Sequence, residues 1–254
     1  MGITLYKLVN KDAHLKNLFR GLAHELRGSM GACASFAQLI KQQHENAFDE
    51  TALRTLDLMT TEYESTKQLL VELSSYADLF DCKVDLLECS ITDIASRALN
   101  ACNEFLSSDG GVVDSGRVNS MMLETEGLSS LKTSPDLMFQ FIYEVLLNSA
   151  QHAVPSKNKG LKCKMSCLSH ANGFRLILSD NGSLLKERDL DYILKPFKTL
   201  KSSRSNTLSA GLGMSKLIQI ADLLSAELRF DFGKDDFSGL QVELDIPAAT
   251  TSSL

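Results

Sequence analysis

The sequence lacks the features that mark several large classes of protein. No apolar run approaches the roughly 20 residues that a bilayer span requires, and residues 1–14, MGITLYKLVNKDAH, lack the long apolar core of a signal peptide. The six cysteines form no CxxC pair and no His/Cys spacing that suits zinc. We therefore expect reduced cysteines, no membrane span in this chain and a cytoplasmic location.

The sequence also lacks an excess of basic residues. Its formal net charge is −6, so no global positive field would attract nucleic acid. With 44% hydrophobic and 23% charged residues, the composition is typical of a soluble globular protein. At 254 residues the chain is long enough for one large domain or two ordinary ones.

Helical periodicity dominates the first third of the chain. Apolar residues recur in steps of three and four along residues 8–44 and again along residues 53–80, with ENAFDE between the two runs. Two long helices with a short connection form an antiparallel hairpin. Because two helices alone bury too little apolar surface, we expect the hairpin, residues 1–82, to pair with a second copy as a dimeric four-helix bundle.

Shorter mixed segments follow from residue 83. The pattern predicts helices at 91–106, 136–153 and 212–224, an irregular stretch at 183–210, and strands at 117–125, 161–169, 174–182, 226–232 and 240–247. Ser134 and Pro135 form a helix-start signature, with an N-cap serine followed by proline at the first helical position. The fold class is therefore α+β, with a helical hairpin followed by an α/β sandwich over residues 83–254.

A polar row lies along the predicted 136–153 helix. Glu144, Asn148 and His152 follow one another in steps of four, so they share one face of the helix. Glutamate and asparagine oxygens are hard ligands of the kind that Mg²⁺ takes. On these residues alone, an ordinary solvated helix face is the simpler interpretation.

Two further segments carry residues suited to binding a nucleotide. Asp180 ends a predicted strand, where its carboxylate can accept hydrogen bonds from an amino group such as that of adenine, and Gly182 allows close backbone approach. An ordinary turn explains the same DNG equally well. Gly211 and Gly213 open a predicted helix, whose N-terminal N–H groups can bind phosphate.

The stretch before those glycines is cationic. It holds Lys195, Lys198, Lys201 and Arg204, with no acidic residue between 192 and 210. A long cationic segment that ends at a helix opened by glycines is typical of a mobile lid over phosphates.

In this order the motifs resemble the conserved boxes of histidine kinases. EVLLNSAQHA, LSDNGSL, ILKPFKTLKSS and SAGLGMSKLIQIADLLSAEL are similar to the N, G1, F and G2 boxes of the Bergerat ATP-binding fold, and FRGLAHELRGSM is similar to the H box. The resemblance covers roughly residues 10–247. It implies a two-component histidine kinase core that uses ATP and Mg²⁺, works as a homodimer and passes a phosphoryl group to an aspartate of a response regulator receiver domain. A separate sensor protein is a further possible partner.

The resemblance also implies roles for individual residues. His24 would be the phosphoacceptor and Glu25 its general base, while Asn148 would hold Mg²⁺ with help from Glu144. The full nucleotide-binding set that we expect is Glu144, Asn148, His152, Asp180, Gly182, Phe197, Lys201, Gly211, Leu212, Gly213 and Met214.

The neighbourhood of His24 agrees with a reactive role. His24 lies about 200° round the helix from the Leu22 seam, and its own face carries Gly21, Gly28 and Gly31. Each glycine costs a helix about 1 kcal/mol. We therefore expect these glycines to leave room for a docking partner.

Several positions depart from the family pattern. Gly28 and Ser29 replace the usual Thr or Asn and Pro of the H box, which predicts weak or absent phosphatase activity, and Leu184 and Ser209 replace glycines of the G1 and G2 boxes. Ser225 stands where the family often has glycine. These changes leave open a histidine phosphotransfer protein or pseudokinase with a degenerate ATP site. A third alternative is a gyrase-like ATPase, in which Glu144 activates water and His24 is incidental.

Overall fold

The computed structural model describes residues 2–44, 47–107, 121–127, 130–152, 161–182, 187–195, 197–198 and 211–248. The chain divides into two compact units, with the main boundary between Cys82 and Lys83. Among the residues that the structure describes, no helix combines the length and the apolar character that a membrane span requires.

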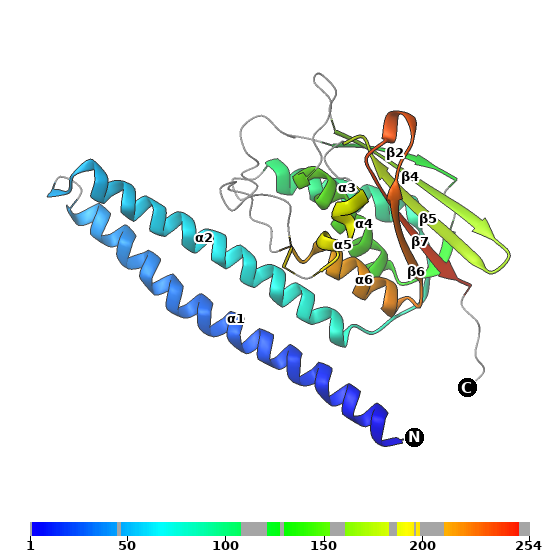
Figure 1. Cartoon of the computed structure of the whole chain (residues 1–254), viewed down its shortest axis with the longest axis horizontal. Helices are drawn as coiled ribbons and strands as arrows, with labels where there is room; N and C mark the ends of the chain where they lie inside the picture. Colours follow the sequence, from blue (N-terminus) through cyan, green and yellow to red (C-terminus); the bar gives the residue numbers. More distant parts are fainter. Residues whose placement is uncertain are drawn as a thin grey trace. The chain divides into compact units, whose positions relative to one another are not determined.

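The first unit is the predicted helical hairpin. Helix α1 (Gly2–His44) and helix α2 (Glu50–Asp78) run antiparallel and side by side, and the short 3₁₀ helix η2 (Leu79–Asp81) follows α2 (Figure 1). Asp49 caps α2, because its Oδ1 accepts a hydrogen bond of 2.7 Å from the Ala52 N–H. Both helices of the hairpin are thus confirmed.

Small residues, rather than leucines, fill the side of α1 that faces α2. Ala23, Ala34 and Ala37 are buried, and Gly31 lies against the Tyr63 ring of α2. The leucine stripe lies about 100° away from Ala23 and stays exposed within one chain. Its large members are Leu22, Leu26, Phe36 and Ile40, all between 41% and 64% exposed.

The second unit is an α/β sandwich built on a mixed five-stranded sheet. The strands stand in the order β2 (Met121–Glu126), β4 (Leu161–His170), β5 (Gly173–Asp180), β7 (Leu240–Pro247) and β6 (Glu227–Phe232). Only the β2–β4 pair is parallel among these neighbours. Figure 1 shows α3 (Ile91–Ser107), α4 (Pro135–His152) and α6 (Gly213–Leu223) on one face of the sheet. The predicted α+β class and sandwich are confirmed.

Alternation along β5 directs Asp180 toward the helices. Phe174, Leu176, Leu178 and Asp180 are the buried residues of this strand, at every second position. Helix α4 covers this layer with a broad apolar surface. Its fully buried members are Leu137, Met138, Phe141, Ile142, Leu146 and Ala150.

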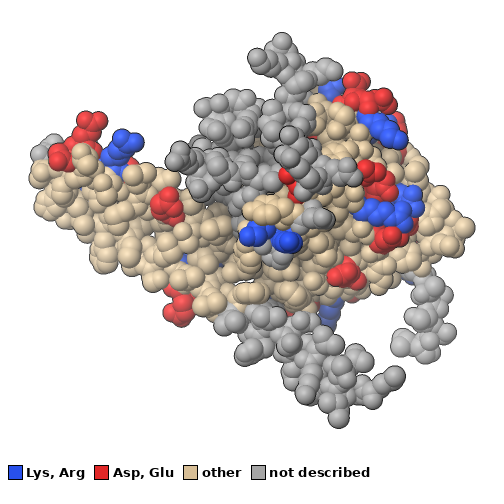
Figure 2. Space-filling model, in the orientation of Figure 1, with Lys and Arg blue, Asp and Glu red and all other residues tan. Residues whose placement is uncertain are grey.

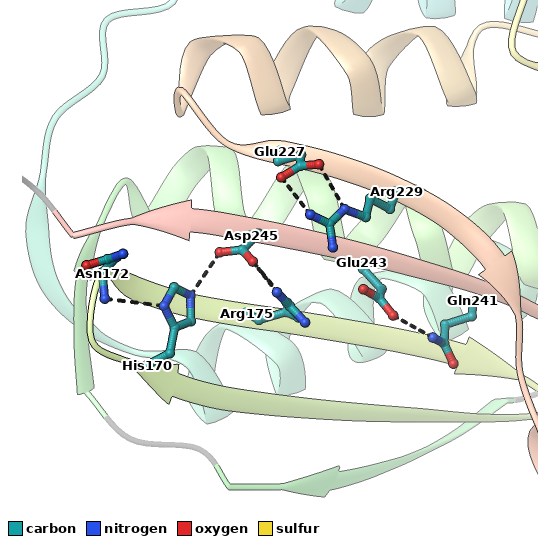
Figure 3. A network of polar contacts seen from close by, with 8 residues as sticks. All are labelled: His170, Asn172, Arg175, Glu227, Arg229, Gln241, Glu243 and Asp245. Atoms are coloured by element: carbon teal, nitrogen blue, oxygen red, sulfur yellow. Dashed lines mark hydrogen bonds and ion pairs between the residues drawn. The ribbon is translucent and has the colours of Figure 1, made fainter.

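A network of charged and polar side chains covers the other face of the sheet (Figure 3). Arg175 Nη2 donates to Asp245 Oδ2 at 2.6 Å, and His170 Nε2 lies 2.9 Å from Asp245 Oδ1. The Asn172 N–H donates to His170 Nδ1, so Nε2 is the ring nitrogen that carries the proton toward Asp245. The hydrogen bonds from Arg175 and His170 hold the pKa of Asp245 below its ordinary value. Figure 2 shows acidic and basic side chains interleaved on the visible surface of the sandwich.

The structure adds elements that the sequence pattern did not predict. Strands β1 (Leu87–Ser90) and β3 (Ser130–Thr133) pair as a separate antiparallel sheet. Helix α5 (Glu187–Ile193) lies inside the stretch predicted to be irregular, where Ile193 gives it a buried anchor. Ser225 has φ 52 and ends α6 as the left-handed residue of a Schellman motif, with the Ala226 N–H bonded to the Ala221 carbonyl at 2.8 Å.

Candidate functional site

Asn148 and Gly213 are in close contact where α4 meets α6. A β-carbon on residue 213 would lie 2.6 Å from Asn148 Oδ1 and 2.8 Å from Nδ2, so any residue other than glycine would displace this amide. Asn148 Nδ2 is buried and finds no hydrogen-bond partner among the described residues. A buried amide donor without a partner beside the N-terminus of α6 fits a phosphate oxygen, and the amide oxygen of Asn148 is of the type that Mg²⁺ takes.

The residues around Gly213 form the start of α6. Gly211 has φ 66, in the left-handed region that favours glycine, Leu212 is fully buried and Met214 is half-buried. The Ser215 hydroxyl is buried without a partner among the described residues. Glycine is thus favoured at the two positions for different physical reasons. Residue 211 adopts a left-handed backbone conformation, and residue 213 lies close to the Asn148 side chain.

Asp180 is held in a polar cradle at the end of β5. Its Oδ1 accepts the Gly182 N–H at 2.8 Å, and its Oδ2 accepts the Ser149 hydroxyl at 3.0 Å. A β-carbon on Gly239 would overlap Asp180 Oδ1, so this side is also closed to any larger residue. Burial is the main cause that raises the pKa of Asp180, and the hydrogen bonds from Gly182 and Ser149 oppose it.

Ser149 joins the two halves of this site, although the sequence analysis gave it no role. It follows Asn148 on α4 and donates to Asp180 on β5. Gly239, in the connection between β6 and β7, was also missed. Its backbone N–H donates to the Asp180 carbonyl at 2.8 Å. No local sequence signal marks either contact, because each joins residues from distant segments.

Glu144 is held by a lysine that the sequence analysis did not single out. Lys216 Nζ donates to Glu144 Oε1 at 2.7 Å, and the two side chains are only 9% and 11% exposed. Glu144 lies one turn before Asn148 on α4, and Lys216 lies three residues after Gly213 on α6. The carboxylate predicted to assist with Mg²⁺ therefore already has a cationic partner.

His24 and Glu25 lie together on the surface of α1. Both side chains are 87% exposed, and His24 Nδ1 lies 4.0 Å from Glu25 Oε1. This distance exceeds a hydrogen bond, but both side chains are free to rotate. β-carbons on Gly21 and Gly28 would meet nothing within 4 Å, whereas one on Gly31 would lie 3.2 Å from Tyr63 Oη. Close packing against Tyr63 therefore explains the glycine at position 31. Of these three glycines, only Gly21 and Gly28 keep an open surface beside His24.

The remaining predicted positions are only partly described. Phe197 is 60% exposed with φ 62, and Lys198 Nζ lies 5.6 Å from the Tyr192 ring centroid. The backbone of His152 ends α4, but its side chain, together with Lys201, Leu184 and Ser209, lies outside the described residues.

Comparisons with known proteins place the chain by its fold. No protein-family model matches the sequence, and no curated protein matches it either. Among solved structures, full-length ShkA in complex with AMPPNP matches with a TM-score of 0.62 and 13% identity, over 93% of this chain and 47% of that chain. The Acinetobacter baumannii histidine kinase AdeS matches with a TM-score of 0.52 and 16% identity, over 89% of this chain and 98% of that chain. The chain thus has the fold of histidine kinase catalytic cores, and the resemblance inferred from the sequence is confirmed at that level.

Proposed function

We propose that this chain is a two-component histidine kinase core that uses ATP to phosphorylate His24 and then transfers the phosphoryl group to an aspartate of a response regulator. One observation carries the proposal. Three segments that were predicted separately meet in one place, since Asn148 contacts Gly213 while its neighbour Ser149 binds Asp180. The complex of the structural neighbour ShkA with AMPPNP supports nucleotide binding by this fold.

In this proposal Asp180 and Gly182 bind the adenine, and the first turn of α6 binds the phosphates. Asn148 supplies an oxygen ligand to Mg²⁺, which would neutralise phosphate charge when it is bound. The chain's own contribution is to orient the phosphates through the N–H groups of α6 and the side chain of Asn148. Phe197 and Lys201 belong to the proposed lid.

His24 is the proposed nucleophile. The lone pair of its Nε2 attacks the γ-phosphorus, and the bond to the leaving ADP oxygen breaks as its electron pair moves onto that oxygen. After a small rotation Glu25 accepts a hydrogen bond from Nδ1–H, which holds the ring in the tautomer with a free Nε2 lone pair, and Glu25 takes this proton as the N–P bond forms. The exposure of both side chains leaves Nε2 accessible to a nucleotide.

A homodimer follows from the exposed stripe on α1. Leu22, Leu26, Phe36 and Ile40 form a continuous apolar face that the hairpin itself does not cover. A second copy would bury it as a four-helix bundle. The open face beside Gly21 and Gly28 is the proposed docking surface for the receiver domain.

The first test is incubation with γ-labelled ATP and Mg²⁺. Wild type should acquire a label that is acid-labile and stable to base, while His24→Ala and Asn148→Ala should acquire none. His44→Gln is the matched control, because His44 is another exposed histidine on α1; it should label like wild type.

Two other outcomes would favour the alternatives. Leu184 and Ser209, in place of family glycines, favour a phosphotransfer protein without ATP use. That function predicts no label from ATP but uptake at His24 from a receiver domain phosphorylated with acetyl phosphate. ATP turnover that is unaffected by His24→Ala would instead indicate an ATPase.

A further inference from the structure

Lys216 occupies an unfavourable position for a lysine. It lies in the first turn of α6, where the helix dipole disfavours a positive charge. Its side chain is 9% exposed, so the ammonium group has also lost most of its water. Apolar residues of similar volume in place of such buried ion pairs are often neutral or stabilising. Fold stability alone therefore gives little reason for the Glu144–Lys216 pair.

The place of the pair suggests what it does. It joins α4 to α6, the two helices that bring Asn148 and Gly213 together, and each partner lies about one turn from that contact. The hydrogen bond of 2.7 Å fixes the first turn of α6 relative to α4. Any change in the pair would shift the Gly213 backbone relative to the Asn148 amide.

We propose that Lys216 is a positioning residue, and that Glu144 acts through it rather than as a ligand of Mg²⁺. The pair holds the phosphate-binding turn of α6 against Asn148, which is left as the protein's oxygen ligand for the metal. This inference rests on the proposed nucleotide-binding function. Glu144 Oε1 is already engaged by Lys216, whereas a gyrase-like ATPase would use this carboxylate to activate water.

The test compares ADP binding with Mg²⁺ and with EDTA, measured by calorimetry on the whole chain. Glu144→Gln and Lys216→Met should each weaken ADP binding by about 10-fold, by the same factor in both conditions, because position does not depend on the metal. Asn148→Ala should reduce the gain in ADP affinity that Mg²⁺ provides. The dissociation constants of ADP measured with Mg²⁺ and with EDTA should therefore approach each other. Lys216→Arg, which keeps the charge and the hydrogen bond, should restore binding.

A double variant keeps the test valid if a single one folds poorly. Glu144→Gln/Lys216→Met leaves no buried charge unpaired, and its effect on ADP binding should be no larger than that of either single change, because both remove the same contact. Urea unfolding of every variant checks the fold.

Two results would overturn the inference. A loss for Glu144→Gln that appears only with Mg²⁺ would make Glu144 a metal ligand after all. Altered stability with unchanged ADP binding in both conditions would make the pair a purely structural one. Failure of the proposed function would look different, since wild type itself would not bind ADP in either condition.

Discussion

The backbone of Gly213 lies so close to Asn148 that a β-carbon there would stand 2.6 Å from the side-chain oxygen. Gly213→Ala should therefore displace the Asn148 amide while the helix itself remains intact, since alanine favours helix. We expect ADP affinity in Mg²⁺ to fall by about 10-fold or more, with little loss of stability. Titration calorimetry and urea unfolding together check this. Unchanged ADP affinity would remove Asn148 from the site.

Asp180→Asn should separate stability from binding. Burial raises the pKa of Asp180, so a folding cost is present at pH values above that folded-state pKa and is relieved as the pH falls through it. The neutral variant should be more stable at pH 7, with the difference in the free energy of unfolding shrinking as the pH falls through the folded-state pKa of Asp180, and it should lose ADP binding. Urea unfolding across this pH range measures the difference. A variant that is destabilised at pH 7 would contradict this explanation.

Asp245 should show the opposite dependence on pH. Arg175 and His170 hold its pKa below the ordinary value of 3.8, so its contribution to stability is complete above that value and is lost as the pH falls through the lowered folded-state pKa. Asp245→Asn should cost about 1 kcal/mol at pH 7. The same unfolding series should show the free energies of unfolding of wild type and variant converging only at acid pH. If they already converge at neutral pH, the role of the network is contradicted.

The glycines of α1 should respond differently to alanine. Gly28→Ala meets open space and should stabilise the hairpin by about 1 kcal/mol. Gly31→Ala approaches Tyr63 Oη at 3.2 Å, so its gain should be smaller or reversed. Urea unfolding compares the two. If Gly28 serves receiver docking, Gly28→Ala should also slow phosphoryl transfer without reducing the label on His24.

The exposed stripe on α1 should control association. Wild type should sediment as a dimer, and Leu26→Glu combined with Phe36→Glu should shift it to a monomer, because a charge cannot be buried at such an interface without a partner. Leu168→Glu, at an exposed apolar position on β4, is the control and should remain dimeric. A monomeric wild type would remove the dimer from the proposal.

Local patterns predicted most of the elements but few of the contacts between them. The periodicity of α1, α3 and α4 and the alternation of β5 are visible within single segments. The bonds from Ser149 to Asp180 and from Lys216 to Glu144 join residues 31 and 72 positions apart, so no local window contains them. The four-residue strands β1 and β3 are too short to show alternation.

The sequence marked Ser225 as a position where the family often has glycine, but it did not show which backbone conformation the serine takes. In the structure Ser225 adopts the left-handed conformation that glycine adopts more easily, and it ends α6. Glu144 was recognised as a polar residue of α4, but its partner was hidden among the apolar positions of α6. The sequence thus showed no sign of the contacts that hold these side chains in place.

The alanine contact between α1 and α2 has a consequence for how the protein is handled in the laboratory. Alanines bring two helices close together but contribute little apolar surface, and the large side chains of the α1 stripe remain exposed within one chain. In the proposed dimer, association and folding of the hairpin are then one equilibrium, governed by mass action. The melting temperature of the hairpin should rise with protein concentration, and dilution alone should loosen it.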